Sequence, residues 1–203
     1  MLTLLGKKAC PADLGSLLYC LGNMERKNSQ LFEEFANKTV LPEIKEPLLK
    51  ISRDNKKHAE ELVEISEKVG HSKLKQKDCE KTMKPVCELT DKILKQIMKK
   101  EKITLEELSN FLALLENSGG SVNFLRVQAE TFLHMSDEIG QVYNMDLTEF
   151  DEHLMDVARL VEEHIIILED IKEKIAQNTP KKDEMGHPIV KYQTPDAWYQ
   201  PAT

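Results

Sequence analysis

The chain has 203 residues, of which 40% are hydrophobic, 5% aromatic and 31% charged, with a formal charge of −7 and only eight glycines and eight prolines. This composition favours one helical domain with an aliphatic core over a β-sandwich. The negative charge argues against nucleic-acid binding, and no apolar run approaches the length that spans a membrane. Because lysines follow the short N-terminal apolar run instead of preceding it, we expect no secretion signal and a cytoplasmic protein.

The first predicted helix runs from about residue 12 to residue 39. Its apolar positions recur every three or four residues, which is typical of a helix with one buried face: Leu14, Leu17, Leu18, Leu21, Leu31, Phe32 and Phe35. Glu25 and Asn28 fall on the same face. A carboxylate at that place would be buried, which costs free energy unless another group pairs with it.

The second predicted helix, from Pro42 to Gly70, carries the most informative apolar seam of the chain. Proline is favoured in the first turn of a helix and glycine just after its last residue. Asn55 and His58 interrupt the seam and are three residues apart, so we expect them one turn apart on the buried face. The full seam is Ile44, Leu48, Ile51, Asn55, His58, Leu62, Ile65 and Val69.

Residues 71–103 are predicted to form a crossover connection that contains one short helix, from Asp91 to Met98. The segment is rich in lysine and contains Pro85, which removes a backbone hydrogen bond if it lies inside a helix. A disulfide between Cys79 and Cys87 would need a break at Pro85, because eight helical residues separate the two by about 12 Å. The chain has no CxxC motif, which argues against a zinc-ribbon or rubredoxin site, and we expect four reduced thiols: Cys10, Cys20, Cys79 and Cys87.

The third predicted helix begins at a T-x-x-E capping box made by Thr104 and Glu107. The pair Gly119–Gly120 interrupts its apolar stripe, so we expect a kink or break there before the helix continues to about Tyr143.

The fourth predicted helix begins at a second capping box, made by Asp146 and Glu149, and runs to about Gln177. Its seam again has a histidine in the middle: Phe150, Leu154, Val157, Val161, His164, Leu168, Ile171 and Ile175. Two helices that each present one inward histidine suggest a site in the core of a bundle.

Residues 178–203 differ in composition from the rest and form a tail rich in proline and aromatic residues. A purely disordered tail would rarely carry the single tryptophan of the chain, Trp198, next to Tyr199. We therefore predict a helical bundle over residues 1–177 and an extended tail over residues 178–203 that docks onto a protein surface.

Three segments of the chain resemble helices of the ferritin-like superfamily, most closely its rubrerythrin-related branch. They are MERKNSQLFEEFANKT for the first helix, LLKISRDNKKHAEELVEISEKVG for the second and VARLVEEHIIILEDI for the fourth. The resemblance covers roughly residues 14–70 and 104–176. It implies an all-α fold: a ferritin-like four-helix bundle with a long crossover, residues 71–103, between helices 2 and 3.

The resemblance also implies a metal site, because the family's di-iron centre takes one Glu from each of two helices and a Glu-x-x-His from each of the other two. Carried over residue by residue, Glu25 matches the ligand of the first helix, and His58 and His164 match the two histidines. Glu116 is the best match on the third helix.

Two positions depart from the family's ligand set. Asn55 and Val161 stand where each Glu-x-x-His motif should have its Glu, and these two carboxylates are the ones expected to bridge the metal ions. Asp54, Glu162 and Glu163 are nearby, but they lie about 100° or more around their helices from a ligand-facing position or point sideways. We therefore do not expect them to replace the missing groups.

This departure favours a bundle that has lost the family's di-iron catalysis and acts through assembly or partner binding. In that case Glu25, Asn55, His58 and His164 would form a polar patch bonded to one another and to water. We assign no catalytic residue, and we expect a homodimer whose tail contributes to the contact or binds a separate protein partner.

The alternative is a non-haem iron oxidoreductase or iron-handling protein, such as a peroxidase or ferroxidase, with a reduced site. Glu25, His58, Glu116 and His164 would then together hold one Fe²⁺ or Zn²⁺ through two nitrogens and two oxygens.

Overall fold

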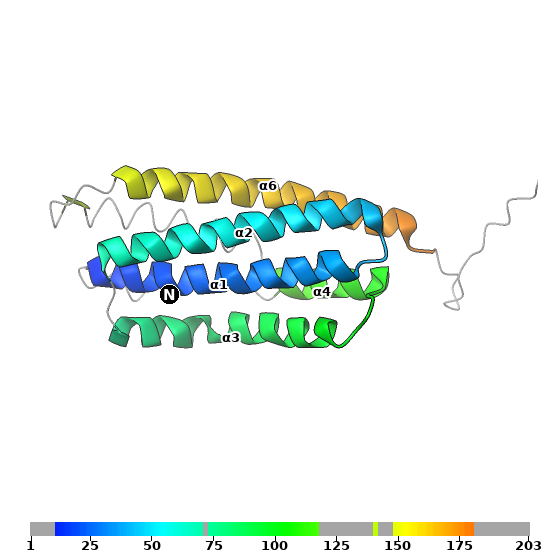
Figure 1. Cartoon of the computed structure of the whole chain (residues 1–203), viewed down its shortest axis with the longest axis horizontal. Helices are drawn as coiled ribbons and strands as arrows, with labels where there is room; N and C mark the ends of the chain where they lie inside the picture. The colour runs from blue at the N-terminus through cyan, green and yellow to red at the C-terminus, as the bar shows by residue number, and fades with distance from the viewer. Residues whose placement is uncertain (1–10, 71–72, 118–139, 142–147, 181–203) are drawn as a thin grey trace, which may run out of the picture.

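The computed structural model of the chain describes residues 11–70, 73–117, 140–141 and 148–180, and most of this part is helical (Figure 1). The named helices are α1 (Pro11–Lys38), α2 (Pro42–Val69), α3 (Lys73–Met98), α4 (Leu105–Asn117) and α6 (Thr148–Asn178). Within the described residues the one β-type pairing is an isolated bridge between Thr39 and Ile103. The prediction of an all-α helical bundle is confirmed.

The helices α1 and α2 form the closest pair of the bundle, and two glycines allow their approach. A Cβ atom added to Gly15 would lie 1.9 Å from the backbone oxygen of Gly70. A Cβ atom at Gly22 would lie 2.8 Å from Cγ2 of Val63 and 3.0 Å from the backbone oxygen of Ala59. Since Gly15 and Gly22 are two turns apart on α1, they present one surface without side chains to α2.

The helix α3 differs from its prediction, because it extends over Lys73–Met98 and not only over the last eight residues. Pro85 lies inside it, although an interior proline costs a helix about 3 kcal/mol. Burial of Ile93 and Ile97 against α1 and the apolar core, with each side chain at most 2% exposed, offsets part of that cost. The helix is not broken between Cys79 and Cys87, which removes the condition for a disulfide between them. Cys20 and Cys87 form no disulfide.

One lysine ties the end of α1 to the end of α3. Lys38 Nζ donates hydrogen bonds to the backbone oxygens of Ile97, Met98 and Lys100, at 3.1, 3.2 and 2.9 Å. The carbonyl groups of Ile97 and Met98 belong to the last turn of α3, which leaves its carbonyls without partners inside the helix and attracts a cation, and Lys100 follows that turn.

The start of α4 is held by the predicted capping box. The Thr104 backbone N–H donates to Glu107 Oε2 at 3.0 Å, and the Glu107 N–H donates to Thr104 Oγ1 at 3.2 Å. The two bonds satisfy N–H groups that the first turn of a helix leaves unpaired. This detail of the sequence analysis is confirmed.

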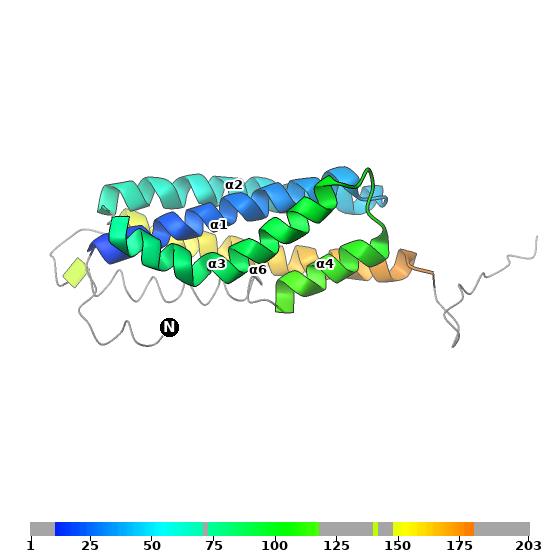
Figure 2. The same ribbon diagram turned by 90° about the horizontal axis from the view of Figure 1, so that it is seen from below.

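The helix order around the bundle follows from the contacts between elements. α1 packs on α2 and on α3, α6 packs on α2 and on α4, and α3 touches α4 (Figure 2). An apolar cluster fills the space between all five helices at one end of the bundle: Leu31, Phe32, Phe35, Ala36, Ile44, Leu48, Ile51, Ile93, Ile97, Ile103, Leu108, Phe111, Leu112, Leu115, Leu168, Ile171 and Ile175. Among the described residues, no helix is both long enough and apolar enough to cross a lipid bilayer.

Several predictions fall outside the described residues and stay predictions. They are the kink at Gly119–Gly120, the continuation of the third helix to residue 143, the capping box of Asp146 and Glu149, and the course of the tail after residue 180. α6 begins at Thr148 and ends at Asn178, close to the predicted bounds of the fourth helix.

Candidate functional site

A polar stretch continues the bundle core beyond the apolar cluster. Its members are buried side chains at seam positions of α1, α2 and α6, with exposed fractions of 8% or less: Glu25, Asn28, Asn55, His58 and His164. A pair of serines marks the boundary with the apolar cluster, since Ser52 Oγ of α2 donates to the backbone oxygen of Ser29 in α1 at 2.9 Å. The helical periodicity predicted that each of the five polar side chains lies on a buried face, and this is confirmed.

Glu25 is the most unusual group in this stretch. Its side chain is 2% exposed, and within the described part of the chain its Oε2 atom has no hydrogen-bond partner. Burial raises the pKa of Glu25 to about 8, because a low-dielectric surrounding disfavours the charged carboxylate. At neutral pH, without a cation beside it, Glu25 is therefore a protonated, uncharged carboxyl group.

His58 faces the same core from α2. It is 1% exposed, and its Nε2 atom has no hydrogen-bond partner among the described residues. Burial and, to a smaller extent, the nearby ring of His164 lower the pKa of His58 to about 4, since two imidazolium charges would repel. The two rings have centroids 6.2 Å apart and are tilted by 37°. The two predicted histidines are thus brought together, and His58 is neutral at neutral pH.

His164 has a partner that the sequence analysis did not expect. Its Nε2 atom lies 3.1 Å from Oδ2 of Asp54, a residue predicted to point away from the site. Position 54 lies beside the α2 seam, and α6 packs against that side of α2, so a short carboxylate there reaches across the helix interface. The polar patch is therefore arranged differently from the prediction, with Asp54 inside it.

The exposed edge of the α2–α6 interface carries a chain of alternating charges. Lys50 Nζ lies 3.0 Å from Glu163 Oε2 and 3.3 Å from Asp54 Oδ2. Burial lowers the pKa of His164, while the hydrogen bond with Asp54 opposes this shift. The same carboxylate thus joins an exposed lysine to a buried imidazole.

Asp54 was not expected to belong to the site because it lies off the α2 seam, and Lys50 carried no prediction at all. A signal was present in the spacing of Lys50 and Asp54, which are four residues apart and hence neighbours on one helix face. No signal in the sequence could place Glu163 opposite them, because that contact depends on how α6 is set against α2.

The donor set can be tested against the two-metal centre that the resemblance implies. Among the described side chains, no three His, Cys, Asp or Glu groups converge on a point that could hold a metal ion. Glu116 lies in α4, but the place of its side chain is outside the described residues, as is that of Val161. A valine has no ligand atom, and Asn55 can offer only a neutral oxygen, so the residues present do not fit a carboxylate-bridged pair of ions.

The comparisons with known proteins agree with the fold. A family model described as Rubrerythrin matches residues 23–127, which is more than half of the chain. The match includes Glu25, Asn55, His58 and Glu116 but ends before α6 and His164. No curated protein and no solved structure matches the chain.

Proposed function

The chain belongs to the rubrerythrin family and has its ferritin-like helical bundle, and we propose that it is a divergent member that has lost di-iron catalysis and acts through assembly or partner binding. The observation that carries the proposal is Asn55. It lies at a position where the family's pattern has a bridging carboxylate, and it is buried in the core with 3% of its surface exposed. A neutral amide there cannot balance the charge of two buried cations.

The surface of α6 supports the assembly part of the proposal. Met155 and Ile166 are large apolar side chains with exposed fractions of 58% and 70%. They are eleven residues apart, which is three helical turns, so they lie on one face of α6. An exposed apolar face of this kind suits a contact with a second copy of the chain, and the tail from residue 178 could extend that contact.

A second candidate function rests on the two atoms that lack partners. Glu25 Oε2 and His58 Nε2 are buried, have no hydrogen-bond partner among the described residues, and are both good metal-ligand atoms. With His164 and Glu116 they would provide the reduced site for one iron or zinc ion. A bound Fe²⁺ would supply one-electron redox chemistry, and the protein would then be an iron-handling protein or a non-haem iron oxidoreductase.

Metal analysis of the purified protein separates the two candidates. We expect the chain, loaded with Fe²⁺ without oxygen and then desalted, to retain no iron. About two irons per chain would refute the loss of the di-iron centre. One ion per chain would favour the reduced site, and a complete lack of retained iron or zinc would refute it.

If an ion is found, a variant tests whether it is bound at the reduced site. His58→Ala should abolish binding at the reduced site, whereas Lys57→Ala, which changes an exposed neighbour on α2, should not alter the metal content. Unchanged metal in His58→Ala would rule out this site.

Truncation after Gln177 tests the proposed contribution of the tail to assembly. The truncated chain should form a smaller particle by light scattering or should melt at a lower temperature. If both the particle size and the melting temperature stay unchanged, the tail contributes neither to assembly nor to packing on its own bundle.

A further inference from the structure

We propose that the groove between α1 and α3 binds an acidic peptide segment of a partner protein. The proposal deepens the partner-binding function given above, because it supplies a surface and a class of partner. The groove has a volume of about 770 Å³ and is called the α1–α3 groove below. It is lined by Cys20, Asn23, Arg26, Lys27 and Gln30 of α1 and by Lys77, Lys81, Lys84, Cys87, Glu88 and Asp91 of α3.

The charge of the α1–α3 groove is opposite to that of the whole chain. Five cationic and two anionic side chains line it, which gives a local charge of +3 in a chain with a formal charge of −7. Two of the cations are already compensated: Lys27 Nζ lies 2.6 Å from Asp91 Oδ2, and Lys84 Nζ lies 3.5 Å from Glu88 Oε1. A cationic groove on an acidic protein attracts anionic partners selectively.

Three cations of the groove have no carboxylate partner among the side chains that the structure describes. Arg26 donates a hydrogen bond to the neutral Asn23 at 2.8 Å, and neither Lys77 nor Lys81 pairs with a carboxylate among the described residues. Lys77, Lys81 and Lys84 are spaced by four and three residues and are exposed, so they form one row along α3. The row can contact several anionic groups at once, and binding there breaks no ion pair that the described residues form with Lys77 or Lys81.

The length of the α1–α3 groove favours an elongated occupant over a small anion. The lining residues of α3 from Lys77 to Asp91 extend over about 21 Å at 1.5 Å per residue. An extended peptide of about six residues spans a similar distance. A single phosphate or carboxylate would reach only one part of this row, whereas a peptide with several Asp or Glu side chains can reach all of it.

The groove also contains thiols, which give it a neutral surface and a chemical reporter. Cys20 is buried and Cys87 is half-buried, and neither forms a disulfide. Burial raises the pKa of the Cys87 thiol, with the charge of Lys27 opposing this shift. An occupant of the groove would cover Cys87 and slow its reaction with a thiol reagent.

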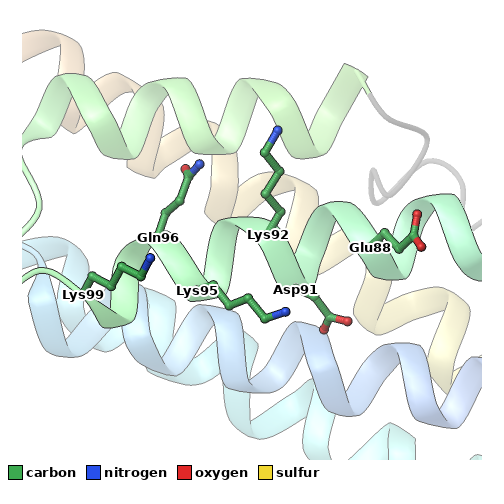
Figure 3. A pocket seen from close by; sticks show the side chains of 6 residues that line it. All are labelled: Glu88, Asp91, Lys92, Lys95, Gln96 and Lys99. Atoms are coloured by element: carbon green, nitrogen blue, oxygen red, sulfur yellow. The ribbon is translucent and has the colours of Figure 1, made fainter.

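A second pocket on α3 supplies the matched control. It is smaller, about 370 Å³, and is lined by Glu88, Asp91, Lys92, Lys95, Gln96 and Lys99 (Figure 3). Lys92, Lys95 and Lys99 lie farther along the chain than Lys77, Lys81 and Lys84, and they do not line the α1–α3 groove. Reversing three lysines here changes the charge of the same helix by the same amount but leaves the α1–α3 groove intact.

The direct test is the binding of a fluorescein-labelled hexaglutamate peptide to the full chain, followed by fluorescence anisotropy at low salt. The native chain should bind saturably. The triple variant Lys77→Glu, Lys81→Glu, Lys84→Glu should bind about tenfold more weakly or worse, and the control variant Lys92→Glu, Lys95→Glu, Lys99→Glu should lose less than about threefold. Equal losses in both variants, or no saturable binding, would overturn the proposal.

Two further measurements fix the kind of occupant and the place of binding. Tripolyphosphate should displace the peptide only at higher concentration than unlabelled hexaglutamate, and the opposite order would show a small-anion site instead. Bound peptide should slow alkylation of Cys87 by N-ethylmaleimide, mapped by mass spectrometry, and an unchanged rate would place the peptide elsewhere.

The failure of this proposal can be distinguished from the failure of the proposed function. Iron content is measured on the same protein sample. Two irons per chain together with peptide binding would refute only the loss of the metal centre. A lack of peptide binding with no retained iron would refute only the α1–α3 groove.

Discussion

The two halves of the bundle core follow the same helical period but differ in chemistry. In the apolar half, Phe35, Leu48 and Ile171 are each completely buried and contact other hydrocarbon groups. In the polar half, Glu25 and His58 are almost equally buried, yet each keeps an atom with no hydrogen-bond partner among the described residues. The repeating buried positions of the helices therefore determine the architecture of the bundle. The polar residues at some of these positions determine what the core can bind.

The two halves also contribute differently to the free energy of folding. Apolar burial stabilises the fold by about 25 cal/mol for each Å² removed from water. An unpaired buried polar group costs roughly 1–3 kcal/mol instead. The apolar half should therefore hold the bundle together, and the polar half should be kept at some cost in stability. Four predictions test this difference, from the largest expected effect to the smallest.

The largest loss should come from Phe35→Ala in the apolar half. Phe35 packs edge-to-face on Phe32 and stacks on Phe111, with ring centroids 5.9 and 6.1 Å away. Removal of the ring should lower the free energy of unfolding by about 3–5 kcal/mol, measured by urea denaturation. His58→Leu in the polar half should be near neutral by comparison, because it removes an unpaired polar atom. Equal losses in the two variants would contradict the division of the core.

The next effect is the pH dependence that Glu25 should cause. Below pH 4.5 this carboxyl is protonated in both the folded and the unfolded state. Between pH 4.5 and about 8 only the unfolded state ionises, so stability should fall as the pH rises, by about 1.4 kcal/mol per pH unit. His58, whose pKa is lowered from 6.5 to about 4, opposes this trend below pH 6.5.

The clear window for Glu25 is therefore pH 6.5 to 8. The native chain, kept free of metal with a chelator, should lose about 2 kcal/mol across it, and Glu25→Gln should remove that loss. Glu60→Gln, at an exposed position on α2, is the control and should leave the native profile unchanged. A flat native profile would mean that Glu25 is already ionised in the fold.

A smaller effect is expected from Asp54→Asn. The variant removes the carboxylate whose hydrogen bond supports the protonated form of His164, so the pKa of His164 should fall further. The loss of stability near pH 6 should be about 1 kcal/mol, because Asp54 is partly exposed and its charge is screened. Titration of the His164 ring by NMR would measure the shift, with Asp156→Asn as a control. An unchanged pKa of His164 would show that Asp54 does not interact with this ring.

The smallest effect should be that of Thr104→Ala at the start of α4. The variant deletes the hydroxyl that accepts the Glu107 N–H, and loss of such a cap costs about 1 kcal/mol. Thermal unfolding should show this, with Ser109→Ala, an exposed change in the same helix, as the control. A similar effect of both changes would mean that the capping box contributes nothing.

The sequence predicted the bundle and the members of its polar core because both depend on local periodicity. The seams of α1 and α2 placed Glu25, Asn55 and His58 in the interior, and the structure confirms those places. The sequence did not predict the role of Gly22. The close approach that excludes a side chain at this position depends on how α2 packs against α1.

Other features could not be predicted because they depend on tertiary packing. Pro85 disfavours a helix at its position, yet α3 is continuous there. Burial of Ile93 and Ile97 outweighs the low helix propensity of the proline. The contact of Asp54 with His164 joins residues 110 positions apart, and it requires the relative placement of α2 and α6. The four-residue metal site stays a prediction, because the side chain of Glu116 is outside the described residues.

The most direct test of the central claim is to restore the two missing carboxylates and count bound iron. The native chain and the double variant Asn55→Glu, Val161→Glu would be titrated with Fe²⁺ without oxygen, and the iron retained per chain would be measured. We predict no retained iron for the native chain and a gain of iron in the double variant. Two irons retained by the native chain would contradict the central claim, whatever the variant does.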